Sequence, residues 1–314
     1  MQRLLHIIKG TAMSKHKVVI FTGGGYFGTT IAAFLSYLPG HLLLPNVVDV
    51  MAGTSIGGII TCALMAGRTG QEILDGFIQH GKKIFTKRWQ NRINPLSIPF
   101  YDNKALKAVV SGFVGDLTIG NSKELFPHCN MFVPATNMTK NKLKVFDSVD
   151  PKDAHYKLLD VSMYTSAAEL YFPVLEDNGD AITDGGIREC SPIVTTACAV
   201  KDKLGADFKD LDVFVFGVGQ AVDGLDHGCG TYKEVSKWGI LDWVTKFVIP
   251  DVTNSNISMS KFWGEHLGFS SFKFFNPIQI RGGLDDTSVT DHILSECAMY
   301  KELFLKEWKE FMER

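Results

Sequence analysis

Residues 50–58, VMAGTSIGG, decide the fold of this chain. The apolar run that ends at Met51 predicts a strand, and the small and apolar residues 59–65 predict a helix. Between them Ser55 lies in a Gly-x-Ser-x-Gly turn, flanked by Gly53 and Gly57. In such a turn the serine takes a strained backbone conformation, and the glycines let strand and helix approach closely. The pattern predicts a hydroxyl that projects beyond a strand end, although an ordinary glycine-rich turn has the same letters.

A second unit of this kind precedes the serine by about thirty residues. Residues 17–21 form an apolar run, residues 23–28 read GGGYFG, and residues 29–38 suit a helix. This spacing fits a right-handed crossover between parallel strands, which brings both turns to the same edge of one sheet. Backbone N–H groups at a helix N-terminus there would favour negative charge.

The same glycines also satisfy a dinucleotide-binding pattern through Gly23, Gly25 and Gly28. That pattern asks for an acidic residue at the end of the next strand. Asp49 has about the right spacing, but the strand ends in the serine turn. Dinucleotide binding is therefore the least favoured of the functions considered.

Composition describes a globular chain without a strong charge preference. Of 314 residues, 45% are hydrophobic and 21% charged, and the net charge is −2. This charge gives no long-range attraction to nucleic acid or to an anionic membrane, so nucleic-acid partners are not expected. Six scattered cysteines without a C-x-x-C pair or a histidine cluster indicate reduced thiols and no metal.

The ends of the chain and its apolar runs bear on location. No run reaches the roughly 18 apolar residues that a membrane span needs. Residues 1–13 lack a cleavage site of small residues, so a cytosolic start is expected. We divide the chain into an N-terminal extension, residues 1–14, and one domain, residues 15–314, because no linker or repeat interrupts it.

Several later segments have recognisable patterns. Residues 129–136 and 142–146 predict paired strands, residues 161–168 and 291–313 predict helices, and residues 211–216 predict a strong strand. Residues 82–92 mix basic and aromatic side chains and could lie on a phospholipid surface, but we favour a helix end with its aromatic residues in the core. Core packing is also expected for the amphipathic stretches 238–250 and 261–263.

The three glycine-marked features suggest acyl transfer. Ser55 would be the nucleophile and Asp184, which follows a short strand and precedes two glycines, the base. The backbone N–H groups of Gly24, Gly25 and Ile56 would face the developing oxyanion. An aspartate pKa of about 3.9 lies roughly 12 units below that of a hydroxyl near about 15.7, so the proton transfer has to be concerted. A triad that adds His227, His266 or His292 is the alternative.

Taken together, these motifs resemble the patatin-like phospholipases. The agreement in order and spacing runs from about residue 17 to 219 and includes five pieces: GGGYFG at 23–28, GTSIG at 53–57, VPATN at 133–137, SAA at 166–168 leading to YFP at 171–173, and DGG at 184–186.

This resemblance implies a three-layer α/β/α sandwich with a mainly parallel central sheet. It also implies a Ser-Asp dyad without histidine, no metal or other cofactor, and cleavage of fatty acyl esters of phospholipids. Ser55 and Asp184 take the two catalytic positions, and the loop glycines with Ile56 take the oxyanion hole. The supporting motif positions are Gly23, Gly28, Gly53, Gly57, Gly185 and Gly186.

Three departures from the family pattern concern the surroundings of the dyad. Phe27 stands where family loops commonly have a basic residue, Thr22 where aspartate is often found, and Ser191 where asparagine often precedes the proline. They bear on head-group preference and rate. Phe27 also motivates an alternative function, a catalytically silent lipid-binding module of the same fold.

The expected function is therefore a lipid acyl hydrolase of phospholipase A type. Its expected partners are an acyl lipid and, peripherally, a membrane, and the resemblance leaves room for a regulatory partner or ligand. The family includes both intracellular enzymes and effectors exported without a classical signal peptide. A cytoplasmic or peripheral membrane location and such export are thus all compatible with the sequence.

Overall fold

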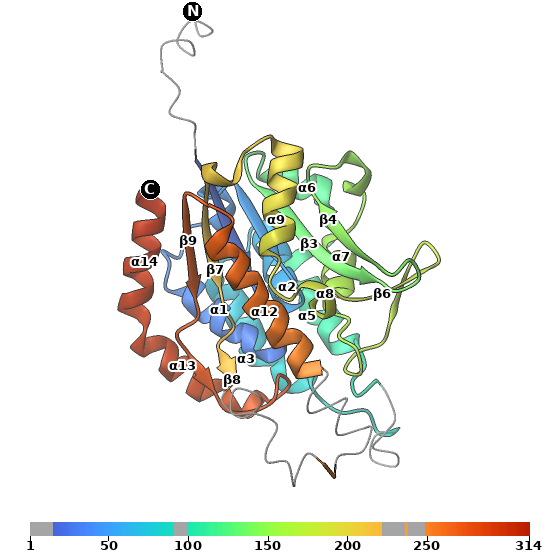
Figure 1. Ribbon diagram of the computed structural model, residues 1–314. Coiled ribbons are helices and arrows are strands. Elements are labelled where there is room, and N and C mark those ends of the chain that lie inside the picture. Colours follow the sequence, from blue (N-terminus) through green and yellow to red (C-terminus); the bar gives the residue numbers. More distant parts are fainter. Residues whose placement is uncertain (1–14, 91–98, 222–235, 238–248) are drawn as a thin grey trace, which may run out of the picture.

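A computed structural model of the protein describes residues 15–90, 99–221, 236–237 and 249–314 (Figure 1). Its centre is an eight-stranded sheet in the order β5-β6-β3-β2-β1-β7-β9, with β4 also paired to β3. The strands are β1 (His16–Phe21), β2 (Val50–Gly53), β3 (Asn130–Asn137), β4 (Lys142–Asp147), β5 (Leu175–Asp177), β6 (Asp180–Asp184), β7 (Leu211–Phe216) and β9 (Ser271–Phe275). The short strands β8 (Gln220–Ala221) and β10 (Gln279–Ile280) pair separately.

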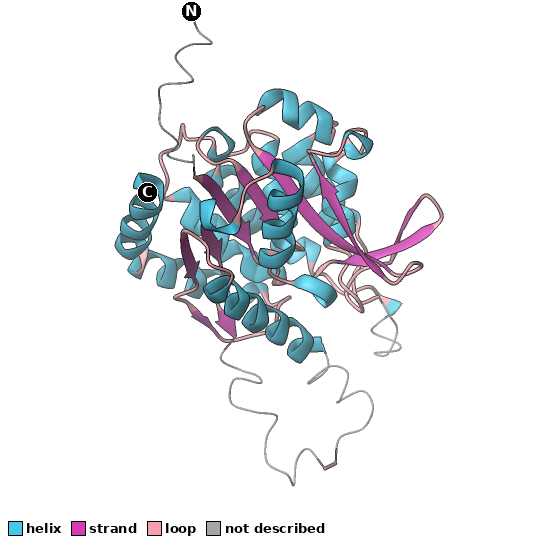
Figure 2. Cartoon of the chain, turned by 45° about the horizontal axis from the view of Figure 1, so that its top comes forward, coloured by secondary structure: helices cyan, strands magenta, loops and turns pink. Residues whose placement is uncertain are grey.

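Helices cover both faces of this sheet (Figures 1 and 2). They are α1 (Gly28–Ser36), α2 (Ile56–Met65), α3 (Gly70–Ile84), α5 (Lys104–Val114), α6 (Ile119–Leu125), α7 (Leu158–Thr165), α8 (Gly186–Glu189), α9 (Ile193–Ala199), α12 (Ile249–His266), α13 (Thr290–Met299) and α14 (Lys301–Glu313). The expected three-layer α/β/α sandwich is thus confirmed.

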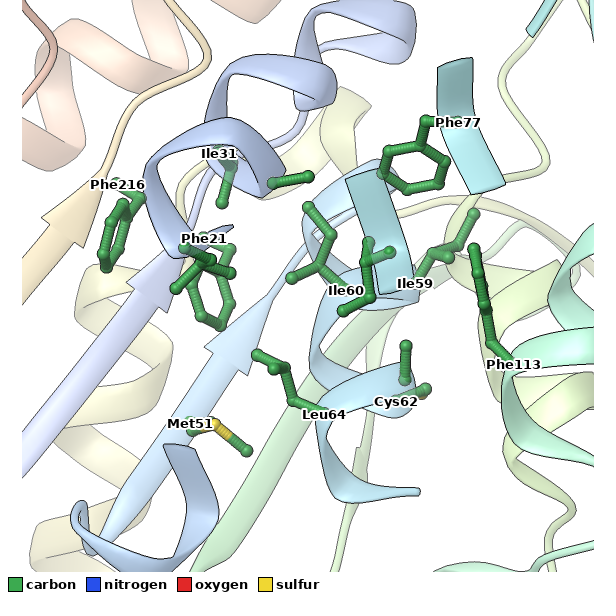
Figure 3. Close-up of a cluster of buried hydrophobic side chains, with 14 of the residues drawn as sticks. Phe21, Ile31, Met51, Ile59, Ile60, Cys62, Leu64, Phe77, Phe113 and Phe216 are labelled. Atoms are coloured by element: carbon green, nitrogen blue, oxygen red, sulfur yellow. The ribbon is translucent and has the colours of Figure 1, made fainter. Parts of the chain in front are cut away.

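Alternation along the buried strands separates the two helical layers. In β1, Val19 and Phe21 belong to one apolar cluster, whereas Val18 and Ile20 belong to the other, because successive side chains of a strand point to opposite faces. The first cluster includes side chains of α1, α2, α3, α5, α13 and α14, and the second includes those of α9. Figure 3 shows the first cluster between the sheet and α2, where Phe21 and Met51 of the strands meet Ile60.

The sheet is mixed, with four parallel pairs in its central and β9 half and three antiparallel pairs at the other end. Strands β3, β2, β1, β7 and β9 run in parallel, so the mainly parallel core that we expected is present. Strands β4, β5 and β6 add the antiparallel part. Ser55 follows a strand of the parallel part, and Asp184 ends a strand of the antiparallel part.

Strands β2 and β6 pair with the same edge of β3, β2 with its first half and β6 with its second half. Phe132 of β3 pairs with Ala52 of β2, and Ala135 pairs with Asp184 of β6, while β4 pairs with both residues of β3 from the other edge. The end of β2 therefore faces the end of β6, three positions apart along β3, or about 10 Å at about 3.3 Å per residue. Asp184 reaches the carboxyl edge of the parallel strands although its own strand runs the opposite way.

Some predicted elements differ from the structure. The helix expected at 291–313 is two helices, α13 and α14, that meet at Tyr300. This break lets α14 pack Phe304 and Trp308 onto the phenylalanines of β7. In the basic and aromatic segment, Ile84 is buried and Phe85 packs on the core, but Trp89 is exposed.

The prediction of core packing for residues 261–263 was wrong. Phe262 and Trp263 are exposed on α12, where the residues buried between positions 256 and 266 are the small Ser260 and Gly264. Most of the similar stretch 238–250, the extension 1–14 and residues 91–98 lie outside the described residues. None of the described helices combines the length and hydropathy needed to cross a membrane.

Candidate active site

Ser55 lies at the sharp turn between β2 and α2. Its φ of 56° and ψ of −124° place it in the left-handed half of conformational space, which non-glycine residues rarely occupy. A Cβ atom on Gly57 would lie 2.3 Å from the carbonyl oxygen of Phe21, so only glycine allows the helix to start this close to β1. The predicted strand, strained serine and helix are therefore all present.

Thr165, at the end of α7, holds this turn from the side. Its hydroxyl accepts the N–H of Ser55 at 2.9 Å and donates to the carbonyl of Pro134 at 2.6 Å. Pro134 lies on β3 between the positions that pair with β2 and those that pair with β6. The N–H of the strained serine is thus satisfied, and it is not free to bind an oxyanion.

The glycine loop between β1 and α1 lies against the serine turn. Its two ends are fixed by hydrogen bonds from Gly23 N to Cys190 O at 2.8 Å and from Tyr26 N to Leu284 O at 2.7 Å. The N–H groups of Gly24 and Gly25, both residues with positive φ, donate to no acceptor within the described part of the chain, although the carbonyl oxygen of Gly24 accepts the N–H of Phe27 at 3.2 Å. Ile56 is the first residue of α2, where a helix leaves its N–H groups unpaired. These are the three donors that the sequence suggested.

Asp184 is the last residue of β6 and is 4% exposed. Its carboxylate accepts the N–H of Gly186 at 2.7 Å, and the hydroxyl of Ser55 is close enough to lower the pKa of this carboxyl in part. Burial raises the pKa of Asp184 to about 8, with a further increase from the charge of Glu169, while the Ser55 hydroxyl and the Gly186 N–H act in the opposite direction. Ser55 and Asp184 are therefore neighbours in the cavity wall, and this carboxylate is far more basic than a solvated one.

A cavity of about 160 Å³ opens beside these two residues. Ser55, Asp184, Gly24 and Gly25 all line it, and most of its wall is apolar: Ile59, Phe77, Ile84, Phe85, Leu106 and Phe172. Lysine, arginine and histidine are absent from its lining within the described residues. The cavity can take an apolar chain next to a serine hydroxyl, a buried carboxylate and unpaired backbone donors.

The supporting glycines of the three motifs all lie at close approaches. An added Cβ would come within 2.2 to 3.1 Å of another atom at every one of them: Gly23, Gly28, Gly53, Gly57, Gly185 and Gly186. At Gly53, Gly57 and Gly185 that atom belongs to the backbone. Packing around Ser55 and Asp184 therefore requires glycine at these three backbone contacts.

The residues behind the alternative functions lie elsewhere. His266 and His292 are exposed and bond to backbone carbonyls outside the cavity, and His227 lies outside the described residues. Asp49 lies before β2, level with Lys17 at the start of β1, at the opposite end of the strands from the glycine loop. Phe27 is 1% exposed in the apolar core and does not line the cavity. A dinucleotide site thus gains no support. Phe27 does not alter the lining of the cavity, so the idea that it makes the protein catalytically silent gains none either.

Two residues of this region were missed from the sequence. Thr165 gives no local signal, because its contacts with Ser55 and Pro134 span 110 and 31 residues. Glu169 lines the cavity beside Asp184. The only signal for it is an acidic residue in the otherwise apolar run between Ala168 and Tyr171.

The family model described as Patatin-like phospholipase matches residues 19–196, which include the glycine loop, the serine turn and the aspartate turn. The chain belongs to the patatin-like phospholipase family. This assignment agrees with the sandwich fold and with the resemblance found in the motifs.

Individual relatives are distant. Patatin-like protein 2 of Oryza sativa subsp. indica is 27% identical over 73% of this chain and 66% of its own length. The cGAMP-activated phospholipase of Escherichia coli (strain TW11681) is 26% identical over 65% of this chain and 61% of its own length. The chain thus spans just under two thirds of the length of these relatives. Among solved structures, VipD from Legionella pneumophila gives a TM-score of 0.49 at 14% identity, covering 99% of this chain and 72% of that one.

Proposed function

We propose that the protein is a lipid acyl hydrolase of phospholipase A type that uses a Ser55–Asp184 dyad. The observation that carries this proposal is that the Ser55 hydroxyl lies beside the buried carboxylate of Asp184 in the wall of an apolar cavity. Membership of a phospholipase family supports the reaction class. The cavity, with its apolar wall, supports an acyl chain as the group that is bound.

In the proposed reaction the Ser55 oxygen attacks the ester carbonyl while its proton passes to Asp184. The carbonyl oxygen becomes an oxyanion facing the N–H groups of Gly24, Gly25 and Ile56. Asp184 then gives the proton to the leaving alkoxide oxygen, the ester C–O bond breaks, and an acyl group remains on Ser55. Water attacks this acyl-enzyme with the same proton movements and releases the fatty acid.

The raised pKa of Asp184 makes this proton transfer less unfavourable. With a carboxylate pKa of about 8, the gap to a hydroxyl near about 15.7 is about 8 units, or roughly 10 kcal/mol at about 1.36 kcal/mol per unit. Each oxyanion donor contributes about 2.7 to 4 kcal/mol as judged by its removal. Three such donors are therefore of the size needed for a concerted transfer without histidine.

Contact with a membrane surface is part of the proposal. Met259, Phe262 and Trp263 on α12 are between 46% and 57% exposed. Asn256 of the same helix donates to the carbonyl oxygen of Ile187 at 3.3 Å, and Ile187 both lines the cavity and is exposed. These exposed apolar side chains of α12 offer a surface that a bilayer could cover.

Phospholipid vesicles test both parts of the proposal. Ser55→Ala is expected to lower fatty acid release by at least about 1,000-fold, whereas Ser111→Ala, on the exposed face of α5, should leave it unchanged. A fluorophosphonate probe should label the wild type and not Ser55→Ala. Both proteins should co-sediment with the vesicles. Full activity of Ser55→Ala would refute the dyad, and absence of co-sedimentation would refute the membrane contact.

Regulation and location stay predictions. Some relatives carry the name cGAMP-activated phospholipase, and adding cGAMP to the vesicle assay tests that ligand for this chain. The expected cytoplasmic or peripheral membrane location, and export as an effector, await localisation of the protein in its own cells.

A further inference from the structure

We infer that Glu169 is a positioning residue of the proposed reaction, whose buried carboxylate strengthens Asp184 as the acceptor of the Ser55 proton. This inference rests on the proposed function and assigns a role to a residue outside the dyad and the oxyanion hole.

Glu169 lines the cavity from a loop with an unusual backbone conformation. It lies between α7 and β5, and the next residue, Leu170, has a φ of 69°. A leucine in this region is strained. The strained loop is held by hydrogen bonds from Phe100 N to Leu170 O and from Tyr101 N to Tyr171 O, both 2.8 Å, and from Tyr171 N to Ala168 O at 3.1 Å.

The carboxylate of Glu169 has no countercharge in this place. Its Oε1 atom is fully buried and makes no hydrogen bond of good geometry with the described residues, although the Thr183 hydroxyl is close enough to lower the pKa of this carboxyl in part. The described residues that line the cavity include no lysine, arginine or histidine. A negative charge on Glu169 is therefore not neutralised locally, and a buried charge of this kind acts strongly on its neighbours.

Asp184 is the neighbour on which this charge acts. The charge of Glu169 is the second cause, after burial, of the raised pKa of Asp184. Two other titratable side chains of the cavity, Cys190 and Tyr171, stay neutral near pH 7. Burial raises the pKa of Cys190 to about 12 and that of Tyr171 above its usual value. Glu169 is thus the one charged group, among the described residues lining the cavity, that Asp184 faces.

The consequence is a coupled pair of carboxyls that bind protons in two steps. Burial also raises the pKa of Glu169, and in the proposed sequence Glu169 loses its proton first, since its charge is one cause of the raised pKa of Asp184. Asp184 then ionises against an existing negative charge, which makes it a stronger base toward Ser55. A stronger base is the property that a dyad without histidine requires.

The test is the pH dependence of kcat/KM for a water-soluble ester, 4-nitrophenyl butyrate. The acid limb of the wild-type profile reports loss of the proton from Asp184. In Glu169→Gln this limb should move to lower pH by about one unit or more, because the repelling charge is gone. The plateau above the limb should fall by about three- to tenfold, because the base is weaker.

Matched variants separate this role from a structural one. Glu169→Leu, also uncharged, should move the limb as Glu169→Gln does, so the test survives if one of them folds poorly. Glu169→Asp, which keeps the charge, should leave the limb near its wild-type position. Glu302→Gln, which removes an exposed carboxylate on α14, should change nothing. An unmoved limb in both uncharged variants, even with a lower rate, would overturn the inference. If Ser55→Ala is active in this assay, the proposed function fails instead.

Discussion

Ser55 and Asp184 line the same cavity at a junction between two differently built parts of the molecule. The Ser55 part consists of parallel strands and glycine turns, and its geometry is fixed by backbone close approaches and a positive φ. The Asp184 part consists of an antiparallel strand and a strained loop, and its chemistry depends on burial and on the charge of Glu169. The comparison teaches that the position of Ser55 depends on close packing of the backbone, whereas the basicity of Asp184 depends on its electrostatic surroundings.

The largest loss of stability is expected from Gly57→Ala, because the added Cβ clashes with the backbone of the Ser55 part. The added Cβ would lie 2.3 Å from the carbonyl oxygen of Phe21, and neither backbone can move without opening the sheet. We expect the free energy of unfolding to fall by about 3 kcal/mol or more, with loss of all activity. Urea unfolding followed by circular dichroism measures the first effect.

Gly112→Ala is the matched control for that substitution. Gly112 lies inside α5, and its added Cβ would meet no atom within 4 Å. Because glycine in a helix costs about 0.5 to 1 kcal/mol relative to alanine, this variant should be slightly more stable than the wild type. Equal stability of the two variants would show that the serine turn is not fixed by close approach.

Asp184→Asn should have the opposite profile, with chemistry lost and fold retained. We expect fatty acid release to fall by about 1,000-fold or more, because the amide cannot accept the Ser55 proton. The stability should rise with pH relative to the wild type. The wild-type carboxyl has a pKa of about 8 when folded and an ordinary value near 3.8 when unfolded, so the folded protein binds the proton more tightly.

The sign follows from that linkage. Proton binding by Asp184 contributes stability that is complete below the unfolded pKa and is lost as pH rises through the folded pKa. The difference in unfolding free energy between Asp184→Asn and the wild type should therefore grow from about pH 4 to about pH 8 and then level off. Parallel stability curves over that range would contradict a raised pKa for Asp184.

The Ser55 part could be predicted from the sequence because its determinants are local. A strand, a glycine turn and a helix follow one another within about twenty residues, so β1 begins one residue before its predicted start, and α2 begins three residues before its predicted start and ends at the predicted residue. The hairpin of β3 and β4 is equally local and was also confirmed. The existence of the Asp184 turn could be predicted from its two glycines, but not the direction from which it enters the site.

What could not be predicted depends on contacts between distant segments. Thr165 and Glu169 act on residues of other elements, and the sequence around them carries no signal of these interactions. Phe262 and Trp263 were assigned to the core because they are large and apolar, but the face of α12 that packs consists of small residues. The sequence pattern identifies the apolar residues of a helix, but tertiary packing decides which of them are buried.

The smallest effect is expected from Thr165→Val, which acts at the junction itself. Valine keeps the shape of threonine but leaves the N–H of Ser55 without its acceptor and the Pro134 carbonyl without its donor. An unpaired buried group of this kind costs about 1 to 3 kcal/mol, and Ser55 would shift from its strained position. We expect fluorophosphonate labelling of Ser55 to slow by about ten- to a hundredfold, because a misplacement of about 1 Å costs up to that much.

Thr165→Ser keeps the hydroxyl and loses only a methyl group, worth about 0.8 kcal/mol, so its labelling should stay near the wild-type rate. If valine and serine slow labelling equally, packing of Thr165 and not its hydroxyl holds the serine turn against the antiparallel part of the sheet.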